Sequence, residues 1–256
     1  MTADHDVQAT LEAIRGKYFD AEGATADLAA LCSSPEHSHL RASLAALEGL
    51  DFKLVRIQAQ MAFWLNTFNA GVLQDIAELA QAASIREVEA FFERPRVRVA
   101  GFAYSLDDIQ HGLLRGNLPK FGRSRAPMRP GDPRLAHMPV VYDERVHFAL
   151  YCAARSSPPL AVFVPGRVDS QLEDATAHYL RRETHVLQEG ATVSLPRQFY
   201  WYADDFGGEH VVLRFALARL DDAIVDLVDR RQGRVKVRYA DFDWAPSGHG
   251  RSHKSN

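Results

Sequence analysis

Two asparagines inside an apolar stretch are the first residues whose type and spacing could do chemistry. Asn66 and Asn69 lie three positions apart in AFWLNTFNAGVL, where an interior asparagine costs helix stability unless its amide makes hydrogen bonds. The amides either hold the backbone of a neighbouring loop or line a site and orient a substrate or a catalytic histidine. Asn66 is therefore a candidate catalytic amide and Asn69 a candidate substrate contact.

A histidine and an arginine form a second group. His111 and Arg115 are four positions apart in SLDDIQHGLLRGN, so they share one face of a helix. A fixed cation beside an imidazole favours the neutral ring, which suits a general base, and the arginine could hold an anionic substrate group. Alternatively, both residues simply form the water-facing side of a helix that buries Leu106, Ile109 and Leu113.

The third group lies in RVHFALYCAARSSPPL. Small and apolar residues occupy both parities of residues 146–154, which predicts a strand buried on both faces. A continuous strand would separate His147 from Ser157 by about 25–30 Å and would turn His147 and Cys152 to opposite faces. A nucleophilic Ser157 would then need a base from another segment, and His111 is the natural candidate. A serine in a plain turn would have the same local sequence.

Composition limits the class of protein. The chain has 256 residues, 46% of them hydrophobic, and a net charge of −3, so we expect a substantial core and no bulk attraction to nucleic acid or to an anionic membrane. Without a signal-like segment or a long apolar window, a soluble cytoplasmic protein with no membrane partner is expected. The oligomeric state is not indicated.

The cysteines and histidines do not predict a metal centre. Two cysteines are too few for a disulfide framework or a thiolate zinc site. The pairs His37/His39 and His249/His253 lie in polar stretches typical of solvated side chains. No cofactor is expected, and a histidine-ligated metal enzyme is only a third hypothesis. Asp204 and Asp205 fit capping and loop roles at least as well as a carboxylate pair.

The elements that must position these residues are helices and short, separated strands. Helices are expected over residues 7–15, 25–32, 53–83, 105–115, 169–182 and 220–230, with Pro35 favouring a further helix start. Ser105 with Asp108, and Ser170 with Glu173, match capping signals. A hairpin is expected within residues 94–106, a long loop over 116–139, and strands over 146–154, 160–164, 191–195 and 234–244.

This mixture lacks regular βαβ alternation and predicts a single α+β domain. We expect a helical N-terminal cap over residues 1–50 and a core domain over residues 51–245. In the core, a small mixed or antiparallel sheet would pack on the long central helix. A disordered polar tail would follow over residues 246–256.

Several segments, taken in order, resemble the signature blocks of the domain of unknown function 547 family. The blocks are AFWLNTFNA, YSLDDIQHGLLRGN, DPRL, VHFALYCAARSSPPL, LPRQFYWYADDFG and VRYADFDW, and they span about Leu54 to Trp244. Because the family's biochemistry is undefined, the resemblance implies a shared fold more than a reaction.

The resemblance also bears on the site residues. The family's Trp-Ile-Asn-x-Tyr-Asn-Ala and Asp-Ile-Glu-His-x-x-Leu-Arg motifs are similar to the segments that hold Trp64, Asn66, Asn69, Ala70, Asp108, Ile109, His111, Leu114 and Arg115. A third motif usually ends in Ser-Cys-Pro-Pro, and here Ser157 stands in the place of that cysteine. If the cysteine is a nucleophile in the family, Ser157 is a hydroxyl that needs a stronger base, the sign of a lost activity, or an engineered replacement of the cysteine.

We therefore favour an enzyme of hydrolase or acyl-transferase type acting on a small anionic or peptide-like substrate. Ser157 would be the nucleophile, His111 the general base, and Asn66 the oxyanion-binding or orienting amide. The remaining candidates are His147 as a further catalytic group and Asn69, Arg115, Trp64 and Cys152 as substrate contacts. The rival hypothesis is a non-catalytic binding or scaffold module, in which the same polar cluster is a hydrogen-bonded core network.

Overall fold

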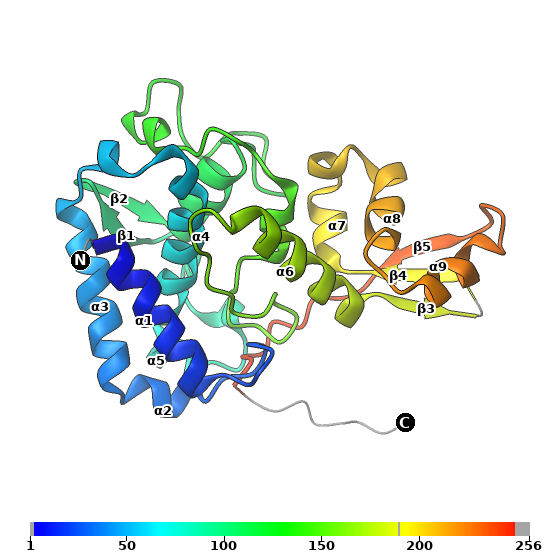
Figure 1. Cartoon of the computed structure of the whole chain (residues 1–256), viewed down its shortest axis with the longest axis horizontal. Coiled ribbons are helices and arrows are strands. Elements are labelled where there is room, and N and C mark those ends of the chain that lie inside the picture. The colour runs from blue at the N-terminus through cyan, green and yellow to red at the C-terminus, as the bar shows by residue number, and fades with distance from the viewer. Residues whose placement is uncertain (1–2, 189, 249–256) are drawn as a thin grey trace.

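The computed structural model describes residues 3–188 and 190–248. A larger lobe holds the N-terminal helices and a hairpin, and a smaller lobe holds a three-stranded sheet with three helices (Figure 1). The α-helices are α1 (Ala3–Tyr18), α2 (Leu28–Cys32), α3 (Pro35–Ala46), α4 (Ile57–Gln74), α5 (Ile76–Gln81), α6 (Val168–Glu183), α7 (Arg197–Trp201), α8 (Glu209–Leu217) and α9 (Asp222–Asp229). The fold is α+β, as predicted.

Shorter elements connect these helices. The 3-10 helices are η1 (Leu47–Gly49), η2 (Phe52–Leu54), η3 (Ile85–Glu87), η5 (Pro133–His137), η6 (Glu144–Phe148) and η7 (Ala203–Phe206), and η4 (Asp108–Leu114) is a π-helix. The strands are β1 (Pro95–Val99), β2 (Phe102–Ser105), β3 (His185–Leu187), β4 (Thr192–Leu195) and β5 (Lys236–Tyr239).

The central helix of the larger lobe is α4. Its residues from Ala62 to Leu73 are all buried, because α1 and α3 cover one side of it and η4 and β1 lie against others. The helical structure predicted over residues 53–83 is confirmed as two consecutive α-helices, since α5 follows α4 after Asp75. The N-terminal helices share this hydrophobic core, and α3 begins at Pro35 with the Ser34 hydroxyl accepting from the His37 amide.

The hairpin and the helix after it form as their local signals predict. β1 and β2 pair antiparallel around a turn at Ala100 and Gly101, with φ of 50° and 81°, the conformation of a tight hairpin turn. Ser105 then accepts from the Asp108 amide at 3.0 Å, and the Asp108 carboxylate accepts from the Ser105 amide at 3.0 Å. This reciprocal cap starts η4.

The smaller lobe has its own core. β4 pairs antiparallel with β3 and parallel with β5, so the sheet is mixed. Its apolar residues pack with those of α6 to α9 and with Phe148. Among the described residues, the β1–β2 hairpin packs on the central helix and the mixed sheet lies in the smaller lobe. The single sheet that was expected on that helix is therefore present as two separate sheets.

The strands predicted over residues 146–154 and 160–164 are wrong. The first segment begins as η6 and both continue as irregular chain. Their buried backbone groups find partners on the side chains of α4: Tyr151 N donates to Asn69 Oδ1 at 2.9 Å, and Phe163 N donates to Asn66 Oδ1 at 2.9 Å. Because side chains satisfy these groups, no β-ladder is needed.

Two smaller predictions also need correction. Helix α6 begins after Arg167 without a side-chain cap, and the Ser170 hydroxyl donates to Arg167 O, so Ser170 and Glu173 do not form the predicted cap. Glu173 pairs instead with two arginines, Arg145 and Arg219. At the C-terminus, Ser247 of the predicted tail is buried and donates its amide to Ala153 O at 2.7 Å.

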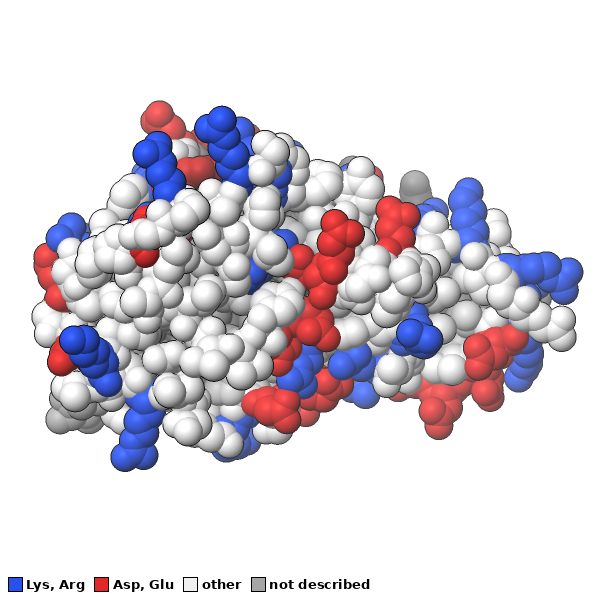
Figure 2. Space-filling view, turned by 90° about the horizontal axis from the view of Figure 1, so that it is seen from above, with Lys and Arg blue, Asp and Glu red and all other residues white. Residues whose placement is uncertain are grey.

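Some predictions lie beyond the described part. Of the tail predicted over residues 246–256, the part from 249 to 256, with His249 and His253, lies outside the described residues. Within the described ranges, no helix is long and apolar enough to cross a membrane. Figure 2 shows a broad uncharged area over the larger lobe, with acidic and basic side chains intermixed elsewhere on that face.

Replacing Asn69 with alanine tests whether its amide holds the irregular segment. The variant loses the acceptor for Tyr151 N and the donor to Ala149 O and Ala161 O. We expect the free energy of unfolding to fall by about 2–4 kcal/mol in urea titrations, because buried groups lose their partners. Gln58→Ala, an exposed change on the same helix, is the control and should shift it by less than about 0.5 kcal/mol. Equal effects of the two changes would contradict this role.

Candidate functional site

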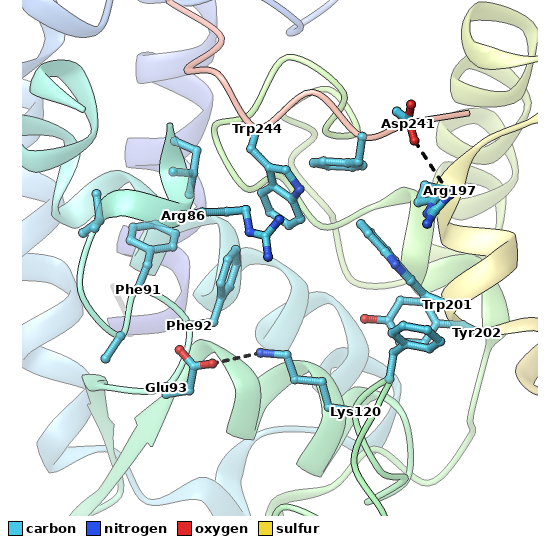
Figure 3. Close-up of a pocket in the computed structure, with 15 residues that line it drawn as sticks. Arg86, Phe91, Phe92, Glu93, Lys120, Arg197, Trp201, Tyr202, Asp241 and Trp244 are labelled. Carbon is cyan, nitrogen blue, oxygen red and sulfur yellow. Dashed lines mark hydrogen bonds and ion pairs between the residues drawn. The ribbon is translucent and has the colours of Figure 1, made fainter. Parts of the chain in front are cut away.

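The candidate site is a pair of adjoining hollows between the two lobes. The inner cavity, of about 120 Å³, is lined by Phe68, Phe92, Asp107, Gln110, His111, Lys120, His147, Leu150, Cys152, Pro158, Gln198, Trp201, Tyr202, Phe242 and Trp244. The outer cleft measures about 710 Å³ and shares with it Phe92, Lys120, Trp201, Tyr202, Phe242 and Trp244. Figure 3 shows Phe92 and Trp244 facing Trp201 and Tyr202 across this cleft. Aromatic side chains thus line the boundary between the two hollows.

A buried ion pair connects the lobes beside the inner cavity. Arg115, at the C-terminal end of η4, donates two hydrogen bonds to Asp205 of η7, with Nε–Oδ2 at 2.6 Å and Nη2–Oδ1 at 2.8 Å. Their side chains are 4% and 3% exposed. The remaining Nη1 donates to His111 Nδ1 and to Pro119 O. Arg115 therefore positions other groups. Its guanidinium binds the Asp205 carboxylate, whereas the sequence predicted that it would bind an anionic group of the substrate.

Helix η4 sets the tautomer of His111. Its π-type turn, with Arg115 N donating to Gln110 O at 2.9 Å, brings positions four apart onto one face. Because an arginine only donates, His111 Nδ1 must accept its hydrogen bond at 3.0 Å, and Nε2 carries the proton. Burial, then the positive charges of Arg115 and Lys120, lower the pKa of His111 well below its ordinary value. His111 is therefore a neutral donor here, an arrangement that does not suit the predicted general base.

His147 has the complementary arrangement. Its Nε2 donates to Asp205 Oδ2 at 2.7 Å, and its ring stacks on Tyr202 with centroids 4.1 Å apart. The side chain is fully buried, and Nδ1 has no hydrogen-bond partner in the described part of the chain. Burial lowers the pKa of His147 despite the carboxylate. The cavity wall thus holds a neutral imidazole in a fixed orientation, and its Nδ1 lone pair accepts no hydrogen bond from the described residues.

Cys152 lines the same cavity as His147. Burial raises the pKa of its thiol to about 11, while the Ala154 amide and the Ser157 hydroxyl act in the opposite direction. The next residue, Ala153, has a φ of 61°, a conformation that costs a non-glycine residue about 1 kcal/mol or more and that clusters at functional sites. The strained turn fixes the thiol at the cavity wall.

Ser157 does not reach the cavity. It is 3% exposed, its hydroxyl donates to Pro158 O at 2.7 Å and accepts from Cys152 N at 3.2 Å, and it is not among the lining residues. The chain turns back on itself where a strand was expected, so the separation calculated for His147 and Ser157 does not apply. The structure places His147 and Cys152 on one cavity, which an extended strand would have prevented.

Three further predicted site residues have structural partners. The Asn66 amide donates to Phe163 O at 2.8 Å, and the Asn69 amide donates to Ala149 O and Ala161 O at 3.3 and 3.1 Å. Trp64 is fully buried and donates to His137 O at 2.7 Å. None of the three lines either hollow. The alternative interpretation, in which the asparagines hold loop backbone, describes their contacts.

Several residues at the site were not predicted from the sequence. Asp205, Gln198 and Tyr202 come from the aromatic segment RQFYWYADDFG, and Lys120 comes from the long loop. The loop's length and the paired aspartates were the available signals. No group of three or more histidine, cysteine, aspartate or glutamate side chains within residues 3–188 and 190–248 is placed to hold a metal ion.

The comparison with protein families agrees with this organisation. The family described as "Protein of unknown function, DUF547" matches residues 52–180, just over half of the chain. The chain belongs to this family. The DUF547 match contains η4 and the segment from His147 to Ser157, whereas Asp205 lies beyond it. The resemblance seen in the sequence is thereby confirmed. No curated protein and no solved structure matches the chain.

The two buried histidines make stability depend on pH. Both pKa values are lowered from 6.5 in the folded state, so the unfolded chain takes up protons first as the pH falls below 6.5. We expect the free energy of unfolding to decrease from pH 7 toward pH 5, by up to about 1.4 kcal/mol per pH unit for each histidine. Urea titrations at several pH values measure this slope.

Single substitutions assign that slope to residues. His111→Gln and His147→Gln should each remove their share of it, whatever they do to stability at pH 7. His39→Gln, at an exposed position of α3, is the control and should keep the original slope. A slope unchanged in both buried variants would show that neither histidine is held neutral.

Proposed function

We propose that the protein is a thiol-dependent hydrolase or acyl-transferase in which Cys152 is the nucleophile and His147 the general base. One observation carries the proposal: His147 Nδ1 is buried without a partner in the described residues, on the same cavity as the thiol. Asp205 orients the imidazole from its other nitrogen. A nucleophile, a base and a carboxylate that orients the base are the three parts of this type of catalysis.

The raised pKa of the thiol defines the first step. A neutral thiol requires a base to take its proton while sulfur forms a bond to the substrate carbonyl carbon. His147 Nδ1 would accept that proton, and Asp205 would stabilise the resulting imidazolium. The salt bridge to Arg115 holds the carboxylate in place. Burial acts to raise the pKa of Asp205, but the hydrogen bonds and charges of His147 and Arg115 outweigh it and hold this pKa well below its ordinary value.

The developing negative charge needs a donor, and the proton held by His147 then passes to the leaving group. The carbonyl oxygen becomes an oxyanion as the S–C bond forms. His111 Nε2–H, whose nitrogen lies 3.6 Å from Asp107 Oδ1, would be the donor that stabilises it from the cavity wall. His147 then protonates the leaving group, and an acyl-enzyme remains. Water or another acceptor attacks this thioester with His147 again as the base, the S–C bond breaks, and His147 returns the proton to the Cys152 sulfur. The roles are thus one nucleophile, Cys152, one base, His147, and one neutral donor, His111.

The size of the hollows limits the substrate. Pockets for complete small ligands usually measure about 300–1,000 Å³, so the inner cavity of about 120 Å³ accepts only a group the size of a side chain. The outer cleft has room for the rest, and its walls hold Arg86, Lys120 and Arg197 together with Glu93 and Asp241. A small anionic or peptide-like substrate fits this division.

The rival function is a binding module without chemistry. The raised pKa of Cys152 favours it, because a buried neutral thiol is unreactive on its own. In that case the outer cleft would bind a partner, and the His147–Asp205 pair would serve only to join the lobes. The reactivity of the thiol separates the two functions.

Alkylation of Cys152 by iodoacetamide tests the proposal. In a Cys32→Ser background Cys152 is the remaining cysteine, and mass spectrometry gives its rate of modification between pH 6 and 10. With His147 as base, the rate should be nearly constant around pH 7–8.5. In His147→Gln the reaction at pH 7.5 should be about 100-fold slower and should rise about tenfold per pH unit toward the pKa of the thiol.

Two further variants complete the experiment. Asp205→Asn should slow the reaction because the orienting carboxylate is lost, and His39→Gln should leave it unchanged. Circular dichroism and urea titration establish that each variant is folded. A Cys152 that does not react at pH 7.5, or that reacts equally fast in His147→Gln, would refute the catalytic role and favour the binding module.

A further inference from the structure

Two buried hydrogen-bond acceptors on the inner cavity have no partner. They are His147 Nδ1 and Gln198 Oε1, neither of which has a partner in the described residues. Gln198 is 5% exposed, and both residues line the cavity. Leaving a buried acceptor unpaired costs about 1–3 kcal/mol. A ligand that donates hydrogen bonds in this cavity would remove that cost.

The orientation of the Gln198 amide is set by its neighbours. The Tyr179 hydroxyl donates to Ser156 O at 2.7 Å, so its oxygen accepts the hydrogen bond from Gln198 Nε2 at 2.8 Å. Reversing the amide would bring Oε1 against the tyrosine oxygen and would cost the bond to Ser156. The amide nitrogen is therefore engaged, and Oε1 remains free to accept.

The surroundings favour a neutral donor over a cation. Arg115 and Lys120 disfavour a positive charge on His111, and they would also repel an ammonium group. The cavity carboxylate of Asp107 already pairs with Lys120 at 2.8 Å. The walls contributed by Phe92, Trp201 and Phe242 are apolar. A carboxamide supplies N–H donors without a charge, whereas an ester of the same shape supplies none.

We infer that Gln198 accepts the N–H of a substrate amide, so that the inner cavity selects amides over esters. This inference rests on the proposed function, because it places the amide beside Cys152 and His147. In the reaction, the S–C bond forms and the C–N bond breaks, and the amine leaves with the proton that His147 took from the thiol. No oxidant or other co-reactant is needed. Gln198 is then a specificity-determining residue.

A matched pair of reagents tests the selection. N-methyliodoacetamide and methyl iodoacetate differ in having an amide N–H or an ester oxygen, and their rates with Cys152 are each divided by the rate with glutathione. We expect the Cys32→Ser protein to prefer the amide by about tenfold after this correction, the effect of one buried hydrogen bond. Gln198→Met should bring the ratio to about one, the value for an unselective thiol.

A control variant and a binding measurement make the outcome specific. Gln110→Met, at another cavity position, should keep the preference for the amide. Binding of N-methylacetamide and methyl acetate, followed by the fluorescence of the cavity tryptophans, measures recognition without chemistry. Amide binding that depends on Gln198 in a protein whose thiol is unreactive would support the amide site and refute only the catalytic role.

Three results would overturn the inference itself. A reactive Cys152 with the same corrected rate for both reagents would leave the thiol chemistry intact and exclude selection of amides. Binding of methylammonium in place of N-methylacetamide would show that the cavity recognises a cation. A preference for the amide that persists in Gln198→Met would assign the selection to another residue.

Discussion

The buried ion pair between Arg115 and Asp205 is the interaction on which the site depends. It joins η4 of the larger lobe to η7 of the smaller one, with both side chains almost fully excluded from solvent. Removing one partner of such a pair costs about 3–5 kcal/mol, because the other charge stays buried. The pair also determines which nitrogen of two histidines carries the proton. Arg115 donates to His111 Nδ1, so Nε2 of that ring is the donor, and Asp205 accepts from His147 Nε2, so Nδ1 of that ring is unprotonated.

A second constraint is the use of side-chain amides in place of a β-ladder. Asn66 and Asn69 of α4 pair with the backbone around Tyr151 and Phe163, so an apolar segment remains buried although it is irregular. That freedom lets the chain turn sharply after Cys152. The C-terminal segment then covers the turn, with Ser247 bound to Ala153. The position of the thiol therefore depends on contacts from the central helix and from the end of the described chain.

Local signals predicted the elements whose causes are local. The periodicity of α4, the turn of the hairpin and the Ser105–Asp108 cap all involve residues within a few positions of one another, and each was found where the sequence placed it. The segment 146–154 was misjudged for the opposite reason. Its composition is typical of a buried strand, but its hydrogen-bond partners come from a helix about 80 residues earlier in the chain.

The sequence by itself determined the family, the α+β class and several polar residues of interest, because motif order, periodicity and residue type are readable along the chain. Only the tertiary structure decided their roles. Which nitrogen of His111 or His147 carries a proton depends on Arg115 and on Asp205, which is 58 residues beyond His147. Whether Ser157 or Cys152 faces a cavity depends on how the chain turns between them. Protonation and exposure are set by neighbours in space, and these neighbours are distant in sequence.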